Sequence, residues 1–252
     1  MIELKTAKEI ELLKIAGAIS AGALMAAGRA VKVGATTADV DKAAYDYILA
    51  HGGKPNFLHY GGFPATACVS VNNEIIHGIP GPRVIREGDI VSVDVGASYK
   101  GFNGDNAATF AAGTVSEEAR RLMEVTREAL ARGIAAAVAG NRIGDIGHAV
   151  QTYVEQNGCS VVREYVGHGV GRALHEDPEV PNFGRAGHGP RLVPGMVIAI
   201  EPMVNAGGYE CEVLPNEWTV VTCDGSLSAH FENTVLITKG EPVILTAVLE
   251  DE

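Results

Sequence analysis

Four acidic residues stand at the ends of apolar segments, where carboxylates are uncommon. Asp94 and Glu201 each end an otherwise apolar segment that is expected to be a strand, while Asp105 and Glu232 each stand at the start of another. A carboxylate buried in such a place costs several kcal/mol unless it is paired or binds a metal ion. These four residues are therefore the first candidates for a site.

The four carboxylates are expected to gather in one place. A short, glycine-bearing connection separates Asp94 from Asp105, and such a hairpin can bring both side chains together across adjacent strands. Four carboxylates crowded together repel one another strongly, and divalent cations remove that repulsion. Because oxygen ligands suit hard or borderline ions, the pattern predicts Mg, Mn, Fe, Co or Zn.

Histidines supply further candidates. His168 and His175 lie in the glycine-rich segment Gly-His-Gly-Val-Gly-Arg-Ala-Leu-His-Glu, which is expected to be a turn that a substrate can approach closely. His77 follows directly after an apolar segment, and His230 neighbours Glu232, where it is expected at most to support the site. The remaining histidines are interpreted as structural: His51, His59, His148 and His188.

The elements that position these residues are predicted in the order helices, strands, helices, strands. A capping box from Thr6 to Glu9 opens the first helix, and a second helix is expected from Thr37 to Gly52. The later elements are expected as strands at 68–71, 90–95 and 107–110, helices at 116–139 and 145–157, and further strands from residue 161.

The two halves of this order align with each other as a repeat. When the second half is shifted by one more residue than in the main alignment given below, Asp94 aligns with Glu201. We therefore predict one domain, residues 1–252, built from two related halves of roughly 1–113 and 114–252 that share a site at their axis. Unrelated halves with a similar order of elements are the alternative. The main alignment superposes Gly34 on Gly140, Asp39 on Asp145, Tyr47 on Tyr153 and Gly52 on Gly158.

The composition disfavours several classes of protein. With 252 residues, 46% of them hydrophobic, the chain can form a large core without disulfide bonds. A net charge of −11 and the lack of a basic run disfavour nucleic acid or an anionic membrane as the partner. The four cysteines form no CxxC pair and no signal peptide is recognised, which predicts a reducing cytoplasm. No apolar stretch is expected to reach membrane-spanning length.

Taken together, the chain strongly resembles the type I methionine aminopeptidases of the pita-bread fold. That fold is α/β (α+β), with two pseudo-symmetric halves and a curved antiparallel sheet covered by helices. Each matching segment alone is a weak signal, whereas all of them in order are a specific one. The match runs from Thr6 to Thr246 and includes residues 72–80 (NNEIIHGIP), 94–95, 104–105, 167–171 (GHGVG), 175–178 (HEDP), 194–203 (PGMVIAIEPM), 218–222 (WTVVT) and 231–234 (FENT).

The resemblance implies a hydrolase that removes the initiator methionine from nascent polypeptides and prefers a small second residue. Asp105 and Glu232 would bridge two divalent metal ions, and Glu201 would also be the general base. His175 would polarise the scissile carbonyl, and His77 would contact the scissile amide. The implied metal ligands are Asp94, Asp105, His168, Glu201 and Glu232.

The same resemblance implies a pocket for the methionine side chain. Aromatic rings and sulfur suit a thioether, although ordinary core packing would use the same residue types. Leu174 stands where the family often has an aromatic residue, which bears on side-chain selectivity. The residues that align with the pocket lining are Tyr60, Phe63, Cys68 and Trp218.

Two alternatives use the same fold. Proline-specific aminopeptidases and dipeptidases share the ligands but usually carry a separate N-terminal domain, and this chain reaches its first helix within a few residues. Non-catalytic binding proteins of the fold tend to lose metal ligands, whereas all five are present here. The expected partners are therefore nascent polypeptides, with transient ribosome association, no nucleic acid or membrane requirement, and a monomeric enzyme.

Overall fold

The computed structural model describes residues 1–247, in which four helices form one layer. Helix α1 (Ala7–Ala30) begins at the predicted capping box, where Thr6 and Glu9 exchange side-chain to backbone hydrogen bonds. The helix predicted at 145–157 begins two residues earlier, and the other predicted helices are confirmed within a few residues. The remaining helices are α2 (Thr37–Ala50), α3 (Glu117–Ala136) and α4 (Ile143–Gln156).

The strands form one large sheet and two small ones, and a short 3-10 helix, η1 (Tyr60–Gly62), lies between β1 and β2. The large sheet contains β1 (Lys54–Pro55), β2 (Ala67–Val71), β4 (Ile90–Tyr99), β5 (Phe102–Ala111), β7 (Gly167–Gly169), β8 (Glu176–Val180), β9 (Val197–Ile200), β14 (Glu232–Leu236) and β15 (Val243–Ile244). The small sheets contain β6 (Ser160–Val161), β10 (Met203–Asn205) and β13 (Ser228–His230), and β3 (Glu74–Ile76), β11 (Cys211–Val213) and β12 (Val220–Thr222).

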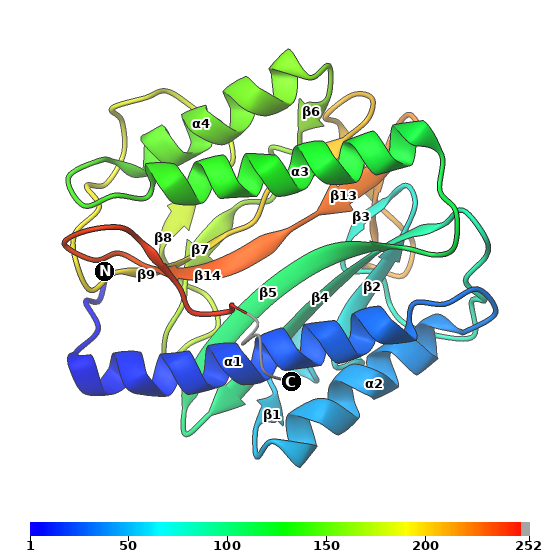
Figure 1. Cartoon of the computed structure of the whole chain (residues 1–252), viewed down its shortest axis with the longest axis horizontal. Helices are drawn as coiled ribbons and strands as arrows, with labels where there is room; N and C mark the ends of the chain where they lie inside the picture. Colours follow the sequence, from blue (N-terminus) through cyan, green and yellow to red (C-terminus); the bar gives the residue numbers. More distant parts are fainter. Residues whose placement is uncertain (248–252) are drawn as a thin grey trace.

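The large sheet divides between the two halves of the chain where β5 pairs with β14. Its order is β1-β4-β5-β14-β9-β7-β8, with β2 also paired to β4 and β15 to β14. Strands from the first half of the chain lie on one side of the β5–β14 contact, and strands from the second half lie on the other. Each half also supplies a helix pair, α1 with α2 and α3 with α4 (Figure 1). The internal duplication stays a prediction, and residues 248–252 lie outside the described part.

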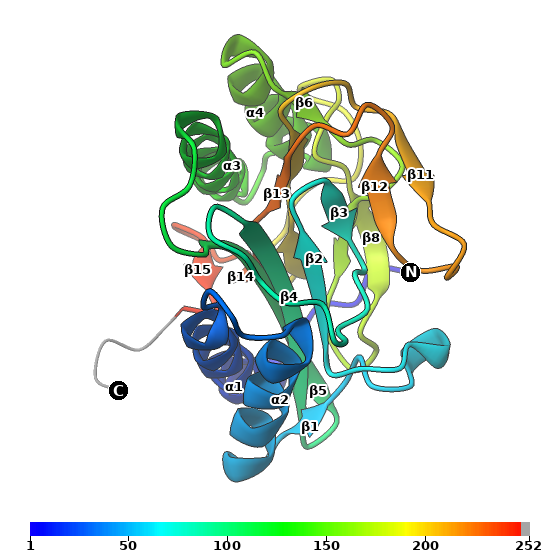
Figure 2. The same ribbon diagram turned by 90° about the vertical axis from the view of Figure 1, so that its right-hand side faces the viewer.

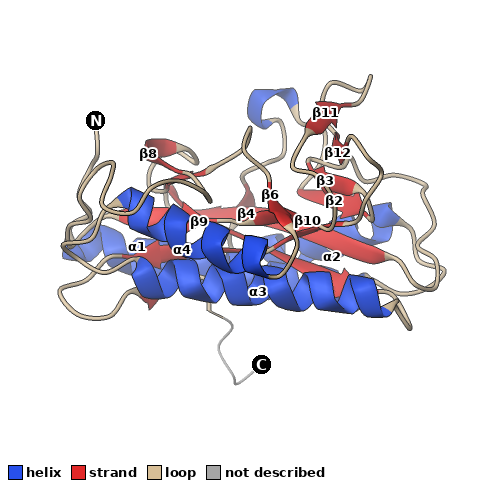
Figure 3. Ribbon diagram, turned by 90° about the horizontal axis from the view of Figure 1, so that it is seen from above, coloured by secondary structure: helices blue, strands red, loops and turns tan. Residues whose placement is uncertain are grey.

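The helices and the small sheets lie on opposite faces of the large sheet. Figures 2 and 3 show all four helices on one face, whereas β3, β11, β12 and η1 lie on the other side. Buried aliphatic side chains fill the space between the helices and the sheet, among them Ile48, Val93, Ile146 and Ile198. The main core therefore lies between the helices and the large sheet, and the opposite face of the sheet is available for a site.

Helix α1 corrects one expectation from the sequence. It is long and apolar enough to cross a membrane, so the expectation that no segment reaches that length is wrong. Its composition has a local cause, because the helix packs against α2, β4 and β5 and buries Leu13, Ala16 and Leu24. Half of its apolar window is buried in this way.

The hairpin between β4 and β5 is also longer than predicted. Strand β4 continues past Asp94 to Tyr99, and the turn is formed by Lys100 and Gly101, both with positive φ. Such two-residue turns match the twist of the paired strands. Asp94 therefore lies in the middle of a strand and Asp105 lies inside the next one, so neither marks a strand end.

The glycine-rich segment around His168 is not a turn at that residue. His168 lies in strand β7, which pairs with both β8 and β9. The flanking glycines allow close approach of neighbouring backbone, because a Cβ at Gly167 would clash with the carbonyl oxygen of Ala199. The cysteines agree with the sequence analysis, since all four are free.

Candidate active site

The register of the large sheet places three carboxylates on one face. Residues paired directly across strands share a face, and alternate residues along a strand do as well. Ala107 in β5 pairs with Asp94 on one side and with Glu232 on the other. Asp105 lies two residues from Ala107 in the same strand, so its side chain joins the other two.

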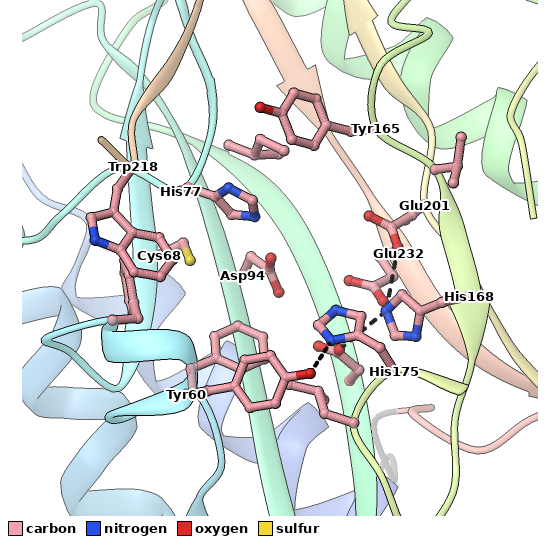
Figure 4. Close-up of a pocket in the computed structure, with 16 residues that line it drawn as sticks. Tyr60, Cys68, His77, Asp94, Tyr165, His168, His175, Glu201, Trp218 and Glu232 are labelled. Carbon is pink, nitrogen blue, oxygen red and sulfur yellow. Dashed lines mark hydrogen bonds and ion pairs between the residues drawn. The ribbon is translucent and has the colours of Figure 1, made fainter. Parts of the chain in front are cut away.

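The same reasoning brings in the residues of β7 and β9. Asn233 pairs with Ile200, so Glu201, directly after β9, lies beside Glu232. Gly169 pairs with Ile198, which places His168 beside Ala199, on the face that Glu201 shares. Five strands therefore bring the predicted metal ligands to one row, and Figure 4 shows Asp94, His168, Glu201 and Glu232 pointing toward one another.

The distances within this row are short. His168 Nε2 lies 3.5 Å from Glu201 Oε1 and 3.7 Å from Asp105 Oδ2. Ligand atoms of Asp105, His168 and Glu232 all lie within 4.8 Å of one another, and all three residues are buried. The structure thus brings Asp105, His168, Glu201 and Glu232 together, and their role as metal ligands stays a prediction.

The carboxylates are held at a high electrostatic cost. Burial raises the pKa of Asp94 to about 7 and raises the pKa of Asp105, Glu201 and Glu232 well above its usual range. Neighbouring carboxylates add to the effect of burial for the last three. Three buried oxygens, Asp94 Oδ1, Asp105 Oδ1 and Glu232 Oε1, have no hydrogen-bond partner among the described residues. Unpaired oxygens of this kind and a neutral imidazole fit divalent metal ions well.

Three histidines of the site are expected to be neutral near neutral pH. Burial lowers the pKa of His77 to about 4, with a smaller contribution from His175. Burial likewise lowers the pKa of His168 to about 4 and also lowers that of His175. A neutral imidazole can ligate a metal ion through one nitrogen or donate one N–H to a substrate, so these histidines can serve either purpose.

A cavity of about 170 Å³ opens above the row of carboxylates. One of its walls is apolar and aromatic, and there the rings of Phe63 and Trp218 meet edge to face at 5.1 Å. The ring of His77 also faces Trp218, with centroids 6.5 Å apart. All the predicted site residues line the cavity: the five expected metal ligands, together with His77, His175, Tyr60, Phe63, Cys68 and Trp218. Their roles towards a substrate stay predictions.

The sequence analysis missed several residues of the cavity. Ile76 precedes His77, and Tyr165 and Val166 precede the His168 segment, so proximity to a motif could have identified them. Phe57 carries no such signal. Leu174, which was noted only as a departure from the family, also lines the wall.

Two further residues that do not line the cavity lie close to Glu201. The Nδ2 of Asn182 donates a hydrogen bond to the carbonyl oxygen of Glu201 at 3.0 Å. His230 is buried, and its Nε2 lies 3.8 Å from Glu201 Oε2, although the sequence had linked His230 with Glu232. Nothing in the sequence pointed to Asn182, because its partner is distant along the chain.

Comparison with known proteins agrees with this site. The fold and the cluster of carboxylates and imidazoles are those of a metallopeptidase. The model of metallopeptidase family M24 matches residues 11–239 of this chain. A methionine aminopeptidase of Clostridium acetobutylicum is 55% identical over 98% of this chain and 99% of its own length. The crystal structure of a methionine aminopeptidase from Thermotoga maritima has a TM-score of 0.96 and 47% identity, covering 98% of this chain and 99% of that one.

The chain therefore belongs to metallopeptidase family M24 and, within it, to the methionine aminopeptidases, which are metal-dependent hydrolases of the pita-bread fold. A prolidase from Pyrococcus furiosus shares the fold less closely, with a TM-score of 0.77 and 27% identity. The match covers 98% of this chain but 66% of that one, so the prolidase has a large additional part.

Proposed function

We propose that the chain removes the initiator methionine from newly made polypeptides, using two divalent metal ions. The observation that carries the proposal is a row of buried, unpaired carboxylates on the floor of a cavity with an apolar wall. A peptide N-terminus entering this cavity would bring its amine to the floor and its first side chain to the aromatic and sulfur-bearing wall. The metal ions supply a Lewis acid and lower the pKa of water that is to attack the peptide bond.

The strand order supports a division of labour among the five ligands. Asp105 and Glu232 lie on the adjacent strands β5 and β14, between the other ligands, and in this proposal they would be the two residues shared by both ions. Asp94 lies on one flank of this pair, and Glu201 and His168 lie on the other. Oxygen ligands with one imidazole suit Co, Mn, Fe, Zn or Mg, and the identity of the ions is part of the proposal.

Three residues are proposed to handle protons and the developing charge. Glu201 would take a proton from the attacking water and later deliver it to the leaving amine. His175 would donate a hydrogen bond to the carbonyl oxygen of the scissile bond as that oxygen gains negative charge. His77, across the cavity, would contact the nitrogen of the same bond.

The cavity wall is proposed to select methionine as the first residue. Phe63, Cys68 and Trp218 surround an apolar space, and aromatic rings make favourable contacts with a thioether sulfur. Leu174 is smaller than an aromatic residue and also borders this space. A preference for a small second residue is part of the proposal, as the resemblance to the methionine aminopeptidases implies.

The cellular setting is proposed from the substrate and the composition. Nascent polypeptides are made in the cytoplasm, and the free cysteines and net charge of −11 suit a monomeric enzyme there that needs neither nucleic acid nor a membrane. Transient association with the ribosome stays a prediction.

Cleavage of Xaa-Pro peptides is the second candidate function, because the fold is shared with a prolidase. Hydrolysis of a Met-Ala peptide and of a Xaa-Pro peptide by the purified protein, before and after chelation and with each divalent metal restored, separates the two. We expect faster cleavage of Met-Ala that requires metal. Faster cleavage of Xaa-Pro would favour the second function, and undiminished cleavage after chelation would refute both.

A further inference from the structure

A tyrosine hydroxyl forms a hydrogen bond with one ring nitrogen of His175. The Oη of Tyr60 lies 2.8 Å from His175 Nδ1, and both residues line the cavity (Figure 4). Tyr60 comes from η1 in the first half of the chain, whereas His175 follows β7 in the second half. With Nδ1 engaged, Nε2 is the nitrogen of His175 left for a substrate.

The turn that carries Tyr60 is built to hold this position. His59 and Gly61 both have positive φ, which turns the chain sharply on either side of Tyr60. The backbone N–H groups of Tyr60 and Phe63 donate to the carbonyl oxygens of Phe57 and Tyr60 at 2.9 Å each. Tyr60 remains 46% exposed. Burial of its ring therefore does not explain why the backbone turns sharply on both sides of this residue.

A tyrosine hydroxyl can donate to Nδ1 or accept from it, and each tautomer of a neutral imidazole carries one N–H. Because a phenol O–H is more acidic than the N–H of a neutral imidazole, donation by Tyr60 to a bare Nδ1 is the favoured arrangement. If Tyr60 donates its hydroxyl proton to Nδ1, the His175 N–H lies on Nε2 and can be donated to a carbonyl oxygen. If Nδ1 carries the proton instead, Nε2 presents a lone pair to that oxygen and repels it. A donor at Nε2 is what a carbonyl gaining negative charge requires.

We propose that Tyr60 is a positioning residue that holds His175 as the Nε2–H tautomer, in addition to lining the cavity. This inference rests on the proposed function, in which His175 donates to the scissile carbonyl. The hydroxyl therefore affects turnover through His175, while the tyrosine ring affects substrate binding directly. Tyr60→Phe removes the first effect and keeps the second.

The first test is a kinetic comparison on the metal-loaded enzyme with a Met-Ala peptide. For Tyr60→Phe we expect kcat to fall about 3- to 10-fold, the size of one neutral hydrogen bond, with little change in KM or in metal affinity. Tyr60→Ala, which also removes the ring, should raise KM in addition. Tyr45→Phe is the matched control, because Tyr45 is 38% exposed on α2 and takes no part in the cavity.

The second test observes the tautomer without turnover. The 15N chemical shifts of the His175 ring distinguish an N–H from a bare nitrogen, in the zinc-loaded protein with labelled histidine. We expect a bare Nδ1 and a protonated Nε2 in the wild type, and a mixture of tautomers in Tyr60→Phe. A protonated Nδ1 in the wild type, or unchanged shifts and unchanged kcat in Tyr60→Phe, would overturn the proposal. Either result leaves the proposed function intact, because that function is tested separately by cleavage of Met-Ala and Xaa-Pro peptides by the wild type with and without metal.

Discussion

The metal-free protein should become more stable when Asp94 is replaced by asparagine, and the gain should grow with pH. Burial raises the pKa of Asp94 from 3.8 to about 7. At pH 8 the carboxyl is ionised in both the folded and the unfolded chain, and the shift of about three units costs the fold about 4 kcal/mol. At pH 5 the carboxyl is still mostly protonated in the fold, so the cost is less than about 2 kcal/mol.

The sign follows from the direction of the shift. A carboxyl whose pKa is higher in the folded state contributes most favourably at low pH and loses that contribution as the pH rises towards 7. The buried histidines act in the opposite direction, since the pKa of His77 and His168 is lowered to about 4 and their contribution is lost as the pH falls. The total pH dependence therefore mixes both effects. The difference between Asp94→Asn and the wild type removes the contribution of the histidines. It retains Asp94 together with the effect of its charge in raising the pKa of the other three carboxyls.

Urea unfolding of the chelated proteins at pH 5 and pH 8 measures this difference. Asp46→Asn is the control, because Asp46 is exposed and forms only a surface ion pair with Lys42, worth about 1 kcal/mol or less. We expect Asp94→Asn to exceed the wild type in unfolding free energy at pH 8 by more than at pH 5. A gain that is equal at both pH values, or a loss at pH 8, would refute the reasoning that burial of this charge destabilises the metal-free fold.

Four further predictions follow from the site and its support. Asp105→Ala or Glu232→Ala should prevent binding of a metal pair, and isothermal titration that still finds two tight ions would contradict the ligand assignment. Chelation should abolish hydrolysis of a Met-Ala peptide, and metal should restore it. His175→Ala should lower kcat by about 10²–10³ with metal affinity retained, as expected for loss of one donor to a developing oxyanion; loss of metal binding with normal turnover at saturating metal would count against that role. Gly104→Ala should destabilise the fold by about 1–3 kcal/mol on thermal unfolding, because a Cβ there would lie 2.6 Å from Cα of Gly17.

The sequence by itself determined the types of residue in the site and most of the elements that carry them. Asp94 and Glu201 each follow an apolar run. This pattern indicates a buried carboxylate that must be paired or bound to a metal ion. Local rules also predicted the helices, since a capping box such as Thr6–Glu9 acts within one turn of chain.

Tertiary structure alone decided how these residues meet. The pairing of Ala107 with both Asp94 and Glu232 depends on register between distant strands, and no local pattern specifies it. The place of Asp94 within β4 was missed for the same reason, because sheet pairing extended the strand to Tyr99. The contact of Tyr60 with His175 joins residues far apart in sequence, so only the folded chain reveals it. Sequence thus specifies chemistry and local conformation, while geometry arises from long-range packing that exists only once the chain has folded.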